Sequence, residues 1–184
     1  MAPAIPVYLE VGAKRVFASA LDWPGWTRAG KDETLALEAL AVYAPRYMKV
    51  PKAARIDFSD GAPTFKVVER VTGNATTDFG APGNPSSTDT RPLAGKEAER
   101  ICDLLAASWK VFDAVVAKAP AELRKGPRGG GRDRDKIADH IIDAIRASAG
   151  GPQSGEKRWP PRYAARRIAW HLLDHAWEIE DRSQ

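Results

Sequence analysis

The segment YAARRIAWHLLDHAWEIE, residues 163–180, indicates most directly what kind of fold this chain forms. Its apolar residues recur at helical spacing, and Pro160 and Pro161 stand just before it, where the first turn of a helix tolerates proline. The segment therefore predicts a long helix near the end of the chain. His171 and His175 are four residues apart in it, so their side chains are expected one turn apart on the same face.

Two further helices are expected before this one. Residues 96–118 carry a wide apolar stripe at helical spacing, and residues 136–145 form a shorter segment with Asp133 or Asp135 as its candidate cap. His140 lies in the shorter segment among isoleucines, on or beside its inward face. The C-terminal half is thus expected to be a helical bundle that contains all three histidines of the chain.

The N-terminal half is expected to be a small module of strands and one helix. Residues 7–11 and 15–21 are rich in β-branched and aromatic residues, and the short glycine-containing break between them predicts a hairpin. Residues 32–44 have helical spacing behind a capping Asp32, and residues 65–71 form a third strand candidate. The expected fold class is α+β, with an N-terminal ββαβ module packed on, or followed by, the C-terminal bundle.

Composition also suggests where the chain divides. Residues 73–95 are rich in Gly, Pro, Ser, Thr and Asn, which predicts a linker or a loop draped over the fold. The expected division is a small module at 1–72, this linker at 73–95 and the bundle at 96–184. The sequence leaves open whether the two halves share one hydrophobic core.

The overall composition excludes several classes of protein. The chain has 184 residues, with 28 Lys+Arg against 24 Asp+Glu, and its 43% hydrophobic content suffices for a packed core. Its single cysteine, Cys102, cannot close an internal disulfide, so a reducing cytoplasm is the expected compartment. No apolar run is long enough to span a membrane, and the first residues lack the pattern of a signal peptide.

The three histidines suggest a metal site. If the last two helices pack antiparallel, His140, His171 and His175 converge, and three neutral imidazoles suit Zn²⁺, Ni²⁺ or Fe²⁺. Three protein ligands leave one position open for water or substrate, as in reactive rather than structural zinc sites. Asp143 and Glu178, each three residues after a histidine, are candidates to accept a hydrogen bond from a ligating imidazole. The alternative is that the histidines are packed residues without a metal and that these acids are solvated or paired with arginines.

A basic glycine-rich loop precedes the second of these helices. Residues 124–136 hold six Lys/Arg and two Asp, a local charge of +4. Its candidate anion-binding residues are Arg124, Lys125, Arg128 and Arg132, because guanidinium groups and backbone N–H groups bind phosphate or carboxylate. The alternative is a solvated loop. Nucleic-acid binding has little support, because no aromatic residues are interleaved with the charges.

The C-terminal half, over about residues 96–182, resembles the DinB/YfiT-like superfamily of helical bundles. The matching segments are DKIADHI at 135–141 and HLLDHAWEI at 171–179. The resemblance implies a divalent metal held by His140, His171 and His175, and some members are transferases or isomerases that depend on a low-molecular-weight thiol. One departure is that only 31 residues separate His140 from His171. The expected bundle therefore either takes its fourth helix from residues 32–44 or has three helices.

The N-terminal half resembles the small module of HicB-like antitoxins in the stretch LDWPGWTRAGKDETLALEAL, residues 21–40. Three functions are therefore expected as alternatives. The first is a metal-dependent transferase or hydrolase that acts on a small molecule. The second is a regulatory or nucleic-acid-binding module, and the third is a metal-free bundle that binds a small molecule. The substrate and the catalytic residues are unknown at this stage, and the oligomeric state stays open, a homodimer included.

Overall fold

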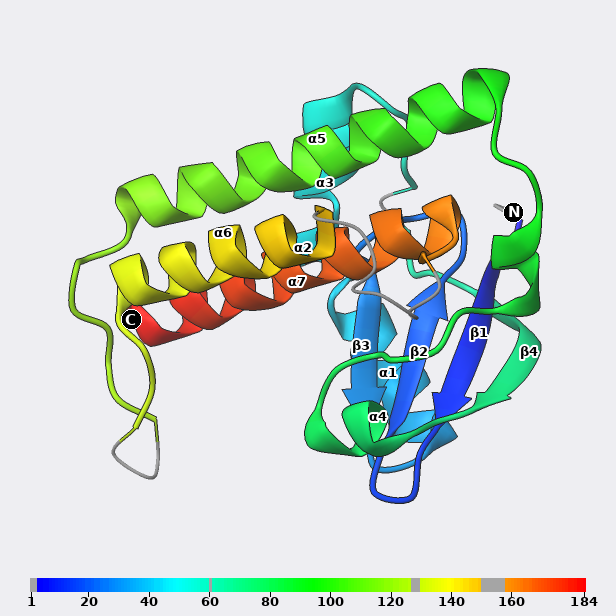
Figure 1. Cartoon of the computed structure of the whole chain (residues 1–184), viewed down its shortest axis with the longest axis horizontal. Helices are drawn as coiled ribbons and strands as arrows, with labels where there is room; N and C mark the ends of the chain where they lie inside the picture. The colour runs from blue at the N-terminus through cyan, green and yellow to red at the C-terminus, as the bar shows by residue number, and fades with distance from the viewer. Residues whose placement is uncertain (1–2, 60, 127–129, 150–157) are drawn as a thin grey trace.

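The structure is a computed structural model that describes residues 3–59, 61–126, 130–149 and 158–184. It confirms the α+β class, with the strands in the N-terminal half and the long helices in the C-terminal half (Figure 1). The sheet has the strand order β3-β2-β1-β4. Strand β1 pairs antiparallel with β2 and parallel with β4. The strands are β1 (Ile5–Val11), β2 (Val16–Ala20), β3 (Thr27–Gly30) and β4 (Phe65–Thr72).

The N-terminal module contains one strand more than the expected ββαβ order. Strand β3, with the sequence TRAG, pairs antiparallel with β2 and forms one edge of the sheet. Four residues without apolar alternation give no strand signal, so the sequence showed only a turn before the first helix. This segment is a strand because it pairs with β2, and not because its own side chains favour the strand conformation.

Three short helices follow β3, namely α1 (Glu33–Val42), α2 (Ala44–Tyr47) and α3 (Lys49–Ala54). Helix α1 packs on β2 and β3, and α3 packs on α5 (Gly95–Lys118). The side chain of Asp32 accepts a hydrogen bond from the backbone N–H of Leu35 at 2.8 Å, which confirms the expected cap. Pro45 lies in the first turn of α2, a position where the missing N–H of proline removes no helical hydrogen bond.

The segment between β4 and the long helices is draped over the face of the sheet opposite α1 (Figure 1). It contains α4 (Ala75–Phe79) and the 3₁₀ helix η1 (Ser87–Thr90). Glu10 of β1 is fully buried beneath it, accepting hydrogen bonds from the hydroxyl of Thr77 and from the backbone N–H of Gly83 at 2.9 Å. A buried carboxylate with these partners fastens the segment to the sheet.

The C-terminal half consists of α5 (Gly95–Lys118), α6 (Arg134–Ala149) and α7 (Pro161–Arg182). Helices α6 and α7 run antiparallel, side by side, and α5 packs against α7 (Figure 1). One hydrophobic core lies between the three helices. Its buried residues are Phe112, Ala119, Leu123, Ile137, Ile141, Leu172, Ala176 and Ile179. This core therefore matches the three-helix form of the expected bundle.

A second core joins the two halves of the chain. It unites residues of the sheet and of α1 with Leu104 of α5 and with Leu173 and Trp177 of α7. Trp26 is fully buried at its centre, where the indole N–H donates to the carbonyl of Leu40 at 2.9 Å. The two halves thus share a core, and α7 contributes to both cores through different faces. None of the helices in the described part of the chain is long and apolar enough to cross a membrane.

Candidate metal centre

Helices α6 and α7 bring the three histidines together. His140 comes from α6, next to the buried Ile141, and His171 and His175 come from successive turns of α7. Each histidine offers a ring nitrogen, and these three atoms all lie within 4.8 Å of one another. The ring centroid of His140 is 5.2 Å from that of His171 and 5.4 Å from that of His175. The antiparallel packing thus brings His140 close to His171 and His175 in space, although His140 and His171 are 31 residues apart in sequence.

The local environment favours neutral imidazoles. Burial, together with the nearby His175 and Arg167, lowers the pKa of His171 to about 3. Burial, followed by the charge of Arg132, also lowers the pKa of His140. A metal ion requires the unprotonated ring nitrogen, so both side chains are in the ligand form at neutral pH.

Glu178 holds His175 in one orientation. Its carboxylate lies 2.8 Å from Nδ1 of His175 and accepts a second hydrogen bond from Arg182 at 2.7 Å. A carboxylate accepts from Nδ1–H, which leaves the lone pair of Nε2 free. Glu178, one of the two acids predicted to lie beside a ligating histidine, is thus within hydrogen-bond distance of His175. Asp143 is exposed, and its charge favours protonation of His140, but the two share no hydrogen bond in the described part of the chain.

The donor set fits a divalent transition metal. Three nitrogen donors, two of them with lowered pKa values, converge on one point, and the ring of the third is fixed by a carboxylate. All three rings are half-buried, so a small molecule has access to them. Imidazole suits Zn²⁺, Ni²⁺ and Fe²⁺, and three protein ligands leave a position open.

The four candidate anion-binding residues of the basic loop have different surroundings. Arg124 donates to the backbone carbonyl of Asp181 at 3.0 Å, and Lys125 pairs with Asp133 at 2.7 Å, so both hold the loop in place. Arg132 is exposed and makes no hydrogen bond or ion pair with any described residue. Arg128 lies outside the described residues.

A hollow of about 470 Å³ lies between the loop and the start of α6. Arg132 and Lys136 line it, together with Glu178, the residue that holds His175. Of the candidate anion-binding residues that are described, Arg132 is thus the one that pairs with no described residue, and it lines the hollow beside Glu178.

Sequence reasoning missed two residues at the start of the histidine face. Arg167 is one helical turn before His171, and its guanidinium lies over the ring of Trp170 at 4.5 Å from the centroid. The ring of Trp170 is in turn stacked on that of His171, at 6.0 Å between centroids and 19° between planes. The available signal was the spacing of four residues between an arginine and the histidine pair.

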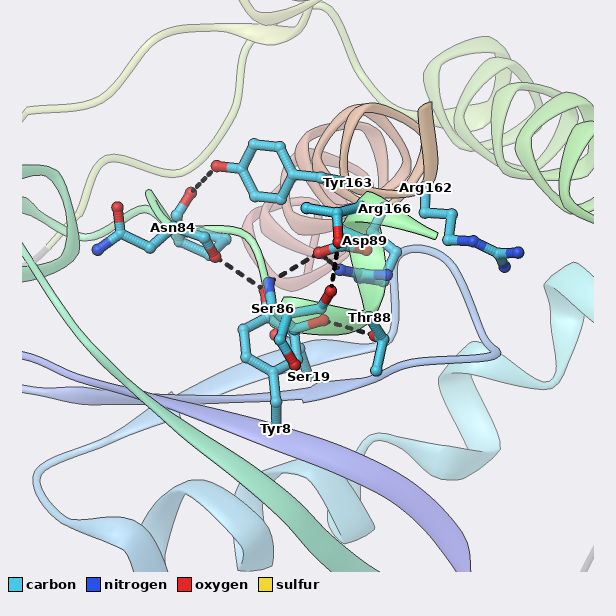
Figure 2. Close-up of polar contacts among 12 residues, drawn as sticks. Tyr8, Ser19, Asn84, Ser86, Thr88, Asp89, Arg162, Tyr163 and Arg166 are labelled. Carbon is cyan, nitrogen blue, oxygen red and sulfur yellow. Dashed lines mark hydrogen bonds and ion pairs between the residues drawn. The ribbon is translucent and has the colours of Figure 1, made fainter. Parts of the chain in front are cut away.

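Sequence reasoning also missed a buried polar cluster between α7 and the draped segment. Figure 2 shows Tyr8 and Ser19 of the sheet, Asp89 of the draped segment and Arg166 of α7 gathered at one place. Asp89 is 1% exposed, pairs with Arg166 and accepts the backbone N–H of Ser86 at 2.8 Å. Its partners are far apart in sequence, so local patterns could not reveal the cluster. The ion pair fixes the first half of α7 against the draped segment.

Comparisons with known proteins add no relative. No protein-family model, curated protein or solved structure matches the chain. The DinB/YfiT-like and HicB-like resemblances therefore stay predictions, and the geometry of the three histidines is the feature that indicates a function.

Proposed function

We propose that this chain is a metal-dependent enzyme, a transferase or hydrolase whose divalent transition metal is held by His140, His171 and His175. The observation that carries this proposal is the convergence of three ring nitrogens within 4.8 Å of one another. These are all the histidines of the chain, drawn from two helices. Among the described residues, no other group of His, Cys, Asp and Glu converges in this way.

Each residue has a defined task in this proposal. The three imidazoles hold the ion, and Glu178 keeps the His175 ring in the tautomer that leaves Nε2 free. Arg182 neutralises part of the charge of Glu178 and connects it to the backbone carbonyl of Arg124 at 2.8 Å. A divalent ion at such a site supplies Lewis acidity, which lowers the pKa of a water or thiol that reaches it.

The resemblance to the DinB/YfiT-like superfamily supports the same proposal and suggests the co-substrate. Some members use a low-molecular-weight thiol, and the half-buried rings give a small molecule access to the site. The substrate itself follows from neither the ligand set nor the resemblance.

Calorimetric titration with Zn²⁺ tests the proposal. Untagged protein is stripped with a chelator and titrated, alongside His140→Ala and the control Asp139→Ala. Asp139 is exposed and precedes His140 on α6. The control therefore changes the same turn of the helix, but at a side chain that points in another direction from that of His140. We expect one ion per chain in the parent and in Asp139→Ala, and greatly weakened binding in His140→Ala. Equal binding by both variants, or none by the parent, would reject the proposed site.

A further inference from the structure

Arg167 is a partly buried cation one helical turn before His171. It is half-buried on α7, and burial lowers the pKa of its guanidinium. It makes no hydrogen bond or ion pair with any residue that the structure describes, whereas its neighbours on the same helix are paired, Arg162 with Glu97 and Arg166 with Asp89. Placing a charge in a partly buried position without compensation costs free energy, so a ligand of opposite charge would relieve it.

Aromatic stacking holds Arg167 beside the histidines. The guanidinium lies over Trp170, which is stacked on His171. Phe17 of β2 meets Trp170 edge-on, with ring centroids 6.1 Å apart, and so fixes it from the sheet side. A guanidinium that stacks by its face keeps its N–H groups in the plane, free to bind a carboxylate or phosphate in a two-pronged fashion.

The carboxylates that influence Arg167 already have other partners. Asp174 favours the charged form of Arg167, but it pairs with Arg28 at 2.8 Å. Glu10 has the same influence, and it accepts hydrogen bonds from Thr77 and from the draped segment. Neither carboxylate bonds to Arg167, so its N–H donors make no hydrogen bond to a carboxylate within the described part of the chain.

A second cation that pairs with no described residue, Arg132, acts on the same histidines through its charge. Arg132 lines the 470 Å³ hollow with Lys136 and Glu178, and its charge, like that of Arg167, lowers the pKa of His171. Two arginines that have no partner in the described ranges therefore act on the candidate metal centre through their charges.

We propose that Arg167 binds the anionic group of the substrate, a carboxylate or phosphate on a small molecule whose reacting group lies at the three histidines, with Arg132 as a second contact. This inference rests on the proposed function, because the histidines define where the reacting group lies. It adds a substrate class, an anionic small molecule, and a residue that selects it.

Calorimetric titration with inorganic phosphate, and separately with acetate, tests the inference. Metal-free protein at low ionic strength is compared with Arg167→Gln, Arg167→Lys and the control Arg70→Gln. Arg70 pairs with Glu33 on the surface of the N-terminal module, so the control removes the same charge far from the histidines. Circular dichroism verifies that each variant is folded.

We expect the parent and Arg70→Gln to bind at least one of the two anions. Arg167→Gln should weaken that binding about tenfold or more, and Arg167→Lys should weaken it less, because it keeps the charge but loses the two-pronged geometry. The anion that binds more tightly identifies the group. Absence of binding to the parent, or equal affinity in Arg167→Gln, would overturn the inference.

Zn²⁺ titration of the same variants separates this inference from the proposed function. Arg167→Gln should bind Zn²⁺ as the parent does. If Zn²⁺ binds and the binding of neither anion depends on Arg167, the inference about Arg167 fails while the proposed function stands. If no Zn²⁺ binds but anion binding depends on Arg167, the proposed function fails and the anion site stands.

Discussion

The carboxylate of Glu178 lies 2.8 Å from Nδ1 of His175, one turn along the same helix. This contact fixes which ring nitrogen faces the other two histidines. Partners of this kind typically contribute 10- to 100-fold, an order-of-magnitude figure, to metal affinity. The contact therefore makes Glu178 part of the candidate metal centre, although it is not one of the three ligands.

We expect Glu178→Ala to weaken Zn²⁺ binding by about 10- to 100-fold, because the His175 ring loses the acceptor that orients it. Competition with a coloured chelator measures the change. Asp181→Ala is the control, since Asp181 lies on the same helix but pairs with Arg46. An unchanged affinity in Glu178→Ala would contradict this role.

Asp89→Asn should destabilise the fold strongly. Asp89 is buried and pairs with Arg166, so the substitution leaves a buried guanidinium without its counter-charge. Breaking such a pair typically costs about 3–5 kcal/mol. Chemical denaturation of the variant measures the loss. The control is Glu33→Gln, which breaks a surface pair with Arg70 and should change stability little. Equal losses in the two variants would show that the buried pair does not hold α7 to the draped segment.

Gly25→Ala should also lower stability, because of backbone strain at a positive φ and because of a clash of the new Cβ. The same substitution at a second glycine, Gly95, measures the backbone strain without the clash. Gly25 has φ +90°, and a Cβ built on it would meet Leu173 Cδ1 at 2.6 Å and Ala169 Cβ at 3.1 Å. Gly95 has φ +56° with nothing within 4 Å of such a Cβ. Gly95→Ala therefore reports the backbone strain alone, about 1–3 kcal/mol. Thermal unfolding should show a larger loss for Gly25→Ala, and a smaller or equal one would argue against close packing of this turn on α7.

The stability of the metal-free protein should fall with acidification, starting below about pH 6.5, the ordinary pKa of an unfolded histidine. The pKa of His171 is about 3 in the fold, so the unfolded chain takes up a proton first and is favoured as the pH falls. One such histidine contributes up to about 1.4 kcal/mol per pH unit. The free energy of unfolding, measured by chemical denaturation at several pH values between 7 and 5, should depend less steeply on pH in His171→Gln than in the parent. Identical slopes in variant and parent would contradict the low pKa.

Much of the fold could be predicted from local sequence patterns. The periodic segments around His140 and around His171 predicted α6 and α7, and β-branched runs predicted β1, β2 and β4. Strand β3 could not be predicted, because its four residues TRAG owe their conformation to pairing with β2. Helical spacing showed that His171 and His175 share a face.

Long-range contacts explain what the sequence could not show of the candidate site. The distance from His140 to the other histidines depends on how α6 packs on α7, which no spacing along the chain specifies. Among the described residues, Asp174 does not pair with Arg167 because it pairs with Arg28, 146 residues away. The role of Asp89 depends on Arg166, 77 residues away.

The metal content of the untagged protein is the most direct test of the central claim that the three histidines bind a metal. Elemental analysis after purification without added metal, and again after incubation with Zn²⁺, Ni²⁺ or Fe²⁺ and desalting, gives the number of ions per chain. We expect close to one divalent transition-metal ion per chain in the parent and close to none in the double variant His171→Leu, His175→Leu. A folded parent that retains no metal under any of these conditions, or a double variant that retains as much as the parent, would contradict the claim.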